Sequence, residues 1–263
     1  MPTWTSDDGL NLNYKFDEGP DDGPTLVLFN GMTQSTEHWS SQAERLSPDF
    51  GVLRWDARGQ GASDVPESIS MEDHLRDLAG LLDHLDVDRA HMVGFSHGAR
   101  LALAMAARRP ERVDKLVLCS LTAEPTALAR TIVTSWKKTL EHGGLEAMSW
   151  TALPAILGNR YLEQHESILS GIVRASIRRN SEAGVETLLD AMDEYPDVAE
   201  LARDVECETL VLSADEDLLV TREGAESLAE LTDGTHRHFS GMGHTIPIEA
   251  PERFADTVRS FLR

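Results

Sequence analysis

Short apolar runs recur along the chain and alternate with segments of helical spacing. Continuous apolar or β-branched stretches of this length are typical of strands that are buried on both faces of a sheet. The runs that predict such strands are Thr25–Phe29, Gly51–Trp55, Ala90–Phe95, Lys115–Ser120, Thr209–Ser213 and the weaker Thr235–Ser240. Ahead of them, Leu10–Phe16 alternates apolar and polar residues, which predicts a half-exposed antiparallel strand.

Helical patterns occupy the intervals between these runs. In Met71–Leu85, leucines recur at spacings of three and four, and Ser70 with Asp73 offers a capping box at its start. The alanine-rich segment His97–Arg109 ends just before a proline, and Pro251–Leu262 begins with one. Strands that alternate with helices predict an α/β fold with a mostly parallel central sheet flanked by helices.

One long segment carries no convincing strand. About 85 residues separate Ser120 from Val205, whereas a plain crossover between parallel strands needs only about a dozen. Its helical patterns are Thr126–His142, Leu145–Leu157, Tyr161–Arg179 and Glu182–Met192. We expect a helical cap, inserted after the sixth strand, over the carboxyl ends of the strands, where ligands bind in open α/β folds. The alternative is an insertion that lies elsewhere on the surface and does not cover these strand ends. Residues 1–121 and 205–263 would then form the core domain, and residues 122–204 the cap.

Composition narrows the class of protein. The 263 residues include 45 acidic and 24 basic ones, for a net charge of −21, which disfavours nucleic acids and anionic membranes as partners. Two cysteines, Cys119 and Cys207, predict neither a metal site nor a disulfide framework. Neither a signal peptide nor an apolar run of membrane-spanning length is found, so we expect a cytoplasmic protein. The oligomeric state is left open.

A candidate nucleophile lies in Gly94-Phe95-Ser96-His97-Gly98, which fits the pattern G-x-S-x-G. The pattern alone is weak, but here it joins a buried strand to a helix, the setting of a nucleophile elbow. Glycines allow the strand and the helix to approach, and the helix N-terminus favours negative charge at the serine. An ordinary glycine-flanked turn is the alternative.

A serine needs a base, and the base needs a carboxylate to orient it. His244 lies between the last strand and the last helix, on the same edge of the predicted sheet as the elbow, and glycine precedes it. Candidate acids follow the run Thr209–Ser213, and spacing leaves three of them open: Asp215, Glu216 and Asp217. We interpret His236 and His238, which alternate on the last strand, as surface residues.

An oxyanion hole needs two backbone N–H groups. One would come from His97, the residue after the nucleophile. The loop after the first buried strand would supply the other, and there Gly31 allows a sharp turn before Met32. Alternatively, Met32 is an ordinary loop residue with no part in an oxyanion hole. The arrangement predicts acyl chemistry without a metal or an organic cofactor.

These residues resemble the α/β-hydrolase fold superfamily, in the branch with a helical cap after the sixth strand. The resemblance covers nearly the whole chain. It includes the Asn30-Gly31 loop, the turn Asp56–Asp64, the elbow, the acid segment Leu210–Val220, and Gly243-His244 with Glu249, Pro251 and Phe254 behind it. In that family the acid stands two variable residues after a small one, which implies Asp217. We interpret Asp56 and Arg58 in the family's turn as internal pairing.

One departure concerns the oxyanion loop, where the family most often has His-Gly and this chain has Asn30-Gly31. A loop that begins with Asn, as here, is similar to the loops of 3-oxoadipate enol-lactonase-like esterases and lactonases. The resemblance implies a serine hydrolase that cleaves small carboxylic esters or lactones. Alternatives with the same triad are a C–C bond hydrolase, a cofactor-free perhydrolase, or a slowly hydrolysing receptor for a small ligand. Cap aromatics that could line the pocket, or simply form core, are Trp136, Trp150 and Tyr161.

Overall fold

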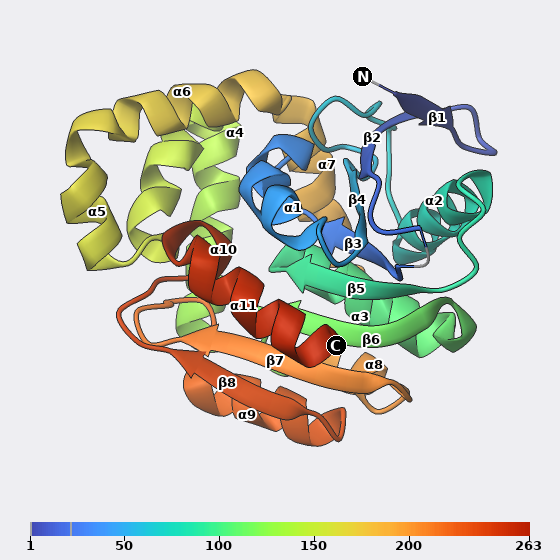
Figure 1. Cartoon of the computed structure of the whole chain (residues 1–263). Coiled ribbons are helices and arrows are strands. Elements are labelled where there is room, and N and C mark those ends of the chain that lie inside the picture. Colours follow the sequence, from blue (N-terminus) through green and yellow to red (C-terminus); the bar gives the residue numbers. More distant parts are fainter. Residues whose placement is uncertain (1, 22) are drawn as a thin grey trace.

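The computed structural model describes residues 2–21 and 23–263. Its centre is an eight-stranded sheet in the order β1-β2-β4-β3-β5-β6-β7-β8 (Figure 1). Strand β2 runs antiparallel to β1 and β4, and the pairs from β4 through β8 are parallel. The strands are β1 (Thr3–Thr5), β2 (Asn11–Asp17), β3 (Thr25–Phe29), β4 (Gly51–Trp55), β5 (Ala90–Phe95), β6 (Val113–Cys119), β7 (Glu208–Ala214) and β8 (Thr235–Phe239).

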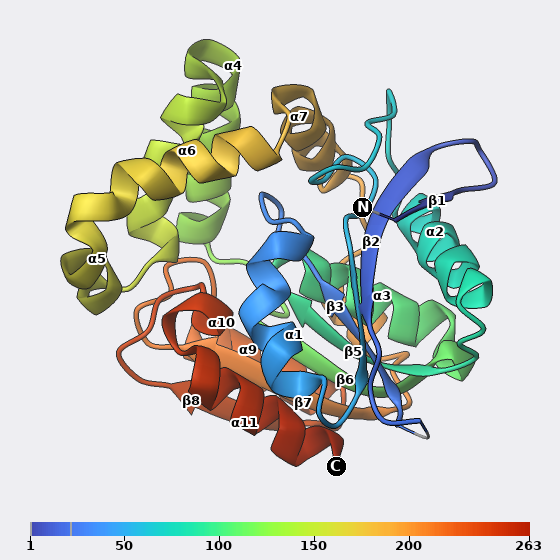
Figure 2. The same ribbon diagram turned by 45° about the horizontal axis from the view of Figure 1, so that its top comes forward.

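Helices cover both faces of this sheet, as the alternating pattern predicted. The helices of the core are α1 (Ser40–Leu46), α2 (Met71–His84), α3 (His97–Arg108), α9 (Arg222–Leu231), α10 (Ile246–Glu249) and α11 (Pro251–Leu262), with the short 3₁₀ helices Thr36–Trp39 and Pro110–Arg112. Two apolar clusters separate the layers. Side chains of α2, α3 and α9 pack on one face and those of α1 and α11 on the other, as Figures 1 and 2 show.

The sixth strand is followed by the helical cap. Its helices are α4 (Ala127–Ile156), α5 (Asn159–His165), the 3₁₀ helix Glu166–Ile168, α6 (Leu169–Arg179), α7 (Glu182–Ala191) and α8 (Val198–Ala202). Helices α4 to α7 gather at the end of the sheet toward which the parallel strands point (Figures 1 and 2). The expected mostly parallel α/β sheet with a cap after the sixth strand is therefore confirmed.

Local differences from the expected elements have simple causes. The two helices predicted on either side of residue 144 are both present within α4, where they are separated by a kink at Gly144, whose φ of 72° and ψ of −178° are not helical. Glycine adopts this backbone conformation without the steric cost that a side chain brings. The pattern missed β1, α1, α8, α9 and α10, of which all but α9 are too short to show a period. His236 and His238 are not surface residues: both are half-buried.

Candidate active site

Ser96 stands at a sharp turn between β5 and α3. Its φ of 53° and ψ of −117° lie outside the regions that residues with side chains normally adopt. A Cβ at Gly94 would overlap Ala99 of the helix, and one at Gly98 would lie 2.5 Å from the carbonyl oxygens of Phe29 and Asn30. Both glycines of the motif are therefore required by close backbone approach. The turn leaves the Ser96 side chain half-buried at the carboxyl end of β5.

His244 and Asp217 complete a hydrogen-bonded chain that begins at Ser96. His244 Nε2 lies 2.8 Å from Ser96 Oγ, and His244 Nδ1 lies 2.7 Å from Asp217 Oδ2. This arrangement suits a His244 tautomer with its proton on Nδ1, which can donate to the carboxylate while Nε2 accepts the serine O–H. His244 and Asp217 are both buried. The other Asp217 oxygen accepts the backbone N–H groups of Leu219 at 2.8 Å and Val220 at 3.1 Å, which fixes the carboxylate.

The two other acids of this loop have different partners. Asp215 Oδ1 accepts the Gly241 N–H at 2.6 Å, so it shapes the turn that leads to His244. Glu216 Oε2 accepts the Asn159 N–H at 2.6 Å, at the start of cap helix α5. Of the three acids that spacing left open, Asp217 is the one in contact with His244, as the family resemblance implied.

The loop after β3 lies directly against the elbow. Gln34 Oε1 accepts the Gly31 N–H at 3.0 Å, and Gln60 Nε2 donates to the Gly31 carbonyl at 3.0 Å, so two side chains hold the turn. Neither the Met32 N–H nor the His97 N–H donates to a protein acceptor among residues 2–21 and 23–263. These two amides are the donors that the sequence suggested for an oxyanion.

Asn30, the residue that departs from the family's usual histidine, turns inward. Its Nδ2 donates to the Trp55 carbonyl at 2.9 Å and to Asp56 Oδ1 at 3.0 Å. Burial raises the pKa of Asp56, although four donors to its carboxylate act in the opposite direction. Asn30 thus ties the loop after β3 to the end of β4, and its backbone leads into the turn at Gly31.

The residue after Ser96, His97, has a buried ring. Burial, with a smaller effect of the Arg100 charge, lowers the pKa of His97 to about 3, so the ring is neutral near pH 7. Its ring centroid lies 5.8 Å from that of His74 and 6.0 Å from that of Tyr195. The uncharged ring leaves the helix N-terminus as the local positive potential at Ser96.

Sequence reasoning missed two groups that hold the His244 loop. The Ser120 hydroxyl donates to the His244 carbonyl at 2.7 Å, and Glu249 accepts hydrogen bonds from Gly243 and Thr245. Only the three-dimensional structure brings Ser120, at the end of β6, next to a residue 124 positions away. A weak signal for Glu249 existed, because it belongs to the family pattern behind His244.

The three cap aromatics do not form one wall. Trp136 is buried in a cap cluster against which Met32 also packs. Tyr161 stacks on His165 with ring centroids 3.9 Å apart. Trp150 is 41% exposed. Of the three, Trp136 is therefore the one that shares an apolar cluster with Met32 of the loop after β3.

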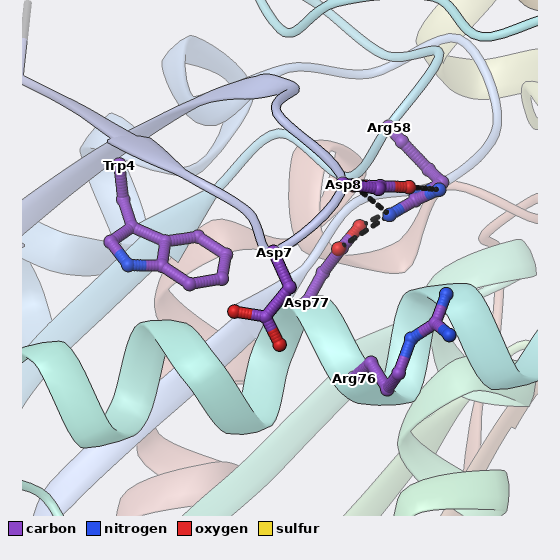
Figure 3. Close-up of a pocket in the computed structure, with 6 residues that line it drawn as sticks. All are labelled: Trp4, Asp7, Asp8, Arg58, Arg76 and Asp77. Atoms are coloured by element: carbon purple, nitrogen blue, oxygen red, sulfur yellow. Dashed lines mark hydrogen bonds and ion pairs between the residues drawn. The ribbon is translucent and has the colours of Figure 1, made fainter.

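Arg58 and Asp56 are each paired, but not with one another. Arg58 contacts Asp77 at 2.6 Å and Asp8 at 3.0 Å, and so ties α2 to the β1–β2 turn. Figure 3 shows this network at a hollow of about 260 Å³, which Trp4, Asp7 and Arg76 also line. The hollow holds none of the candidate catalytic residues, so the pairs stabilise the fold.

Over residues 2–21 and 23–263, no cluster of three or more histidine, cysteine or acidic side chains has an arrangement that could hold a metal ion. Within the same residues, none of the helices has the length and apolar character needed to cross a membrane.

Comparison with known proteins supports the fold. The family model described as alpha/beta hydrolase fold matches residues 24–142. RutD of Pantoea ananatis, provisionally named a carbamate hydrolase, is 29% identical over 247 residues, which cover 92% of this chain and 89% of that protein. The enol-lactonase structure from Burkholderia xenovorans superposes with a TM-score of 0.90 at 26% identity and covers 99% of each chain.

A third comparison is a thermophilic esterase from Thermogutta terrifontis, with a TM-score of 0.86 at 26% identity over 99% of this chain and 96% of that one. The chain therefore has the α/β-hydrolase fold, and the resemblance drawn from sequence is confirmed at this level.

Proposed function

We propose that this protein is a serine hydrolase that cleaves small carboxylic esters or lactones through an acyl-enzyme. The observation that carries the proposal is the chain of hydrogen bonds from Asp217 through His244 to Ser96, at 2.7 and 2.8 Å. A base within hydrogen-bond reach of a hydroxyl, itself oriented by a third group, is the arrangement that activates a serine.

The first half of the reaction forms the acyl-enzyme. Ser96 Oγ attacks the substrate carbonyl carbon while its proton passes to His244 Nε2. Asp217 stabilises the resulting imidazolium through Nδ1 and remains ionised. When the tetrahedral intermediate collapses, His244 returns the proton to the leaving alkoxide. From an ester the alcohol departs, whereas from a lactone the new hydroxyl stays attached to the acyl group.

The second half releases the acid. Water occupies the position of the leaving group, His244 Nε2 takes its proton, and the hydroxide attacks the acyl carbon. Collapse of the second intermediate returns the proton to Ser96 Oγ. Each proton therefore moves through His244 alone, and the mechanism proposed here calls on no cofactor.

Negative charge on the carbonyl oxygen is stabilised by the Met32 and His97 amides. Preorganised donors of this kind contribute roughly 3–4 kcal/mol each to transition-state stabilisation. The N-terminus of α3 adds a favourable dipole at the same place, because the helix begins at His97.

The size of the substrate follows from the cap. Helices α4 to α7 lie at the carboxyl end of the sheet, and Ser96 directly follows β5 at that end. A serine beneath such a cap would favour short substrates over long acyl chains. The names of similar proteins supply the classes to test, namely esters and lactones. Carbamates are the second candidate, because RutD carries that provisional name and a carbamate presents the same carbonyl to the serine.

Turnover of a substrate panel tests the proposal. Short p-nitrophenyl esters, small γ- and δ-lactones and aryl carbamates would be incubated with wild-type protein and with Ser96→Ala. We expect hydrolysis of esters or lactones by the wild type alone. Faster turnover of carbamates would reassign the substrate class, and no turnover of any member would favour a ligand-binding receptor of the same fold.

A further inference from the structure

The Glu249 carboxylate joins two parts of the molecule that are distant in sequence. Oε2 accepts the N–H of Gly243 at 2.9 Å and the N–H of Gly158 at 3.0 Å, while Oε1 accepts the Thr245 hydroxyl at 2.8 Å. Gly243 and Thr245 flank His244, whereas Gly158 separates α4 from α5 in the cap. One side chain therefore holds the loop of the proposed base and a joint of the cap.

The two backbones meet closely at this point. A Cβ added to Gly158 would lie 2.8 Å from the Gly243 nitrogen and 2.8 Å from Glu249 Oε2. One added to Gly243 would overlap the backbone of Leu157 and Gly158. The Thr245 N–H also donates to the Ile156 carbonyl at 3.1 Å. Glycine at both positions thus leaves room for direct contact between the end of α4 and the His244 loop.

The His244 loop needs such external support because its own sequence is flexible. Gly241-Met242-Gly243 precedes the histidine, and Gly241 has a φ of 72°. Glycine loses more conformational freedom on ordering than any other residue, so this segment has little intrinsic preference for the observed path. Hydrogen bonds to both residues that flank His244 restrict the rotation of its backbone.

We propose that Glu249 is a positioning residue that holds His244 on Ser96 and seats the cap joint on the same loop. This inference rests on the proposed function, since it assigns a role through His244. Glu249 touches neither Ser96 nor the substrate carbonyl; it acts through the backbone amide of Gly243 and the hydroxyl of Thr245.

The geometry distinguishes a role in positioning from a role of the charge. A glutamine at 249 can still accept both glycine N–H groups with its carbonyl oxygen. Its NH₂ group then faces the Thr245 hydroxyl, which can accept that bond and donate to the Ile156 carbonyl 3.3 Å away. An aspartate keeps the charge but is one methylene shorter and cannot reach all three donors.

The test compares variants at Glu249 with a matched control. Glu249→Ala, Glu249→Gln and Glu249→Asp would be assayed for kcat and KM on a short p-nitrophenyl ester and for the rate at which a fluorophosphonate labels Ser96. Glu216→Ala is the matched control, because it removes a hydrogen bond to the same cap joint, at Asn159, without removing a side-chain bond to the residues that flank His244.

We expect Glu249→Ala to lose roughly 10²-fold in kcat and in labelling rate, which is the scale of a 1 Å misplacement of a reacting group. Glu249→Gln should keep most of both rates. Both rates should be well below those of the glutamine variant in Glu249→Asp. Glu216→Ala changes KM more than kcat. Should Glu249→Ala not fold, the order of the glutamine and aspartate variants decides the question.

Three results would overturn the inference, and they are distinguishable. Labelling of Glu249→Ala at the wild-type rate would remove the positioning role while leaving the proposed function intact. An aspartate variant more active than the glutamine variant would show that charge, not geometry, is what matters. If the wild-type protein itself is not labelled, the proposed function fails, and the role of Glu249 fails with it.

Discussion

The Ser120 hydroxyl donates a hydrogen bond of 2.7 Å to the backbone carbonyl of His244. Ser120 directly follows β6 and has a φ of 57°, and Ser96 directly follows the neighbouring strand β5 and has a φ of 53°. Two adjacent strands are thus each followed by a serine with a left-handed φ value. One of them is the proposed nucleophile, and the other holds the backbone of the proposed base. Strain of this kind, about 1–3 kcal/mol per residue, persists where the surroundings fix the conformation.

Variants at Ser120 separate the hydrogen bond from the strain. Ser120→Ala removes the bond, worth about 1 kcal/mol, and keeps the strained φ. Ser120→Gly removes the bond and relieves the strain. We expect both variants to have similarly reduced kcat, with Ser120→Gly the more stable of the two in thermal unfolding. A glycine variant with wild-type kcat would show that the bond to His244 has no part in activity.

Substitution of the three neighbouring acids tests the assignment of Asp217. Asp217→Asn keeps the shape of the side chain but deprives His244 Nδ1 of its ionised acceptor. We expect kcat to fall on the scale of ~10⁴, as for the corresponding change in serine proteases. Asp215→Asn and Glu216→Gln act only on the loop and the cap joint, and steady-state kinetics should show much smaller losses. If Asp215→Asn proves the most damaging, the assignment is wrong.

The buried His97 ring contributes to the pH dependence of stability. Its pKa is about 3 in the folded chain, well below the value of 6.5 for an exposed histidine. The unfolded chain therefore binds more protons between these values, and this stabilising contribution is complete above pH 6.5 and declines as the pH falls towards 3. The contribution of His97 to the free energy of unfolding changes by at most about 1.4 kcal/mol per pH unit.

Denaturant unfolding between pH 7 and 4 measures this slope. In His97→Leu the free energy of unfolding should fall less steeply with decreasing pH than in the wild type. His142 is exposed, so His142→Gln is the control and should follow the wild-type curve. Equal slopes for all three proteins would mean that His97 is not held neutral by burial.

The cap tryptophans differ in burial and should differ in stability. Trp136 is 6% exposed within the cap cluster and Trp150 is 41% exposed. Trp136→Ala should cost about 3–5 kcal/mol and alter KM, because Met32 packs against the same cluster. Trp150→Ala should leave the free energy of unfolding within about 0.5 kcal/mol of the wild type. Chemical denaturation of both variants, with KM for a short ester, checks this pair.

The parts of the fold that the sequence predicted are those with a long local signal. Continuous apolar runs identified the parallel strands, and a strand–turn–helix motif identified Ser96. Helix α1, with the sequence SSQAERL, is too short and too polar to show a period. His236 and His238 look like the polar face of an edge strand, yet both side chains contact Ser213 of β7, at 2.8 and 2.9 Å.

The groups that support the site were beyond the reach of local patterns. Glu249 meets Gly158 across 91 positions of the chain. Such contacts depend on how the cap packs on the sheet, and no periodicity in either segment encodes that packing. The sequence therefore supplied the residues proposed for the chemistry, while the structure supplied those that hold them in place.

Covalent labelling of Ser96 by a fluorophosphonate is the most direct test of the proposed nucleophile. Only a hydroxyl activated by a base and next to oxyanion donors attacks such a reagent readily, so a stoichiometric adduct mapped to Ser96 by mass spectrometry is expected for the wild type. Ser96→Ala should fold normally and remain unlabelled. An adduct on another residue, or a wild-type protein that stays unmodified, would contradict the account.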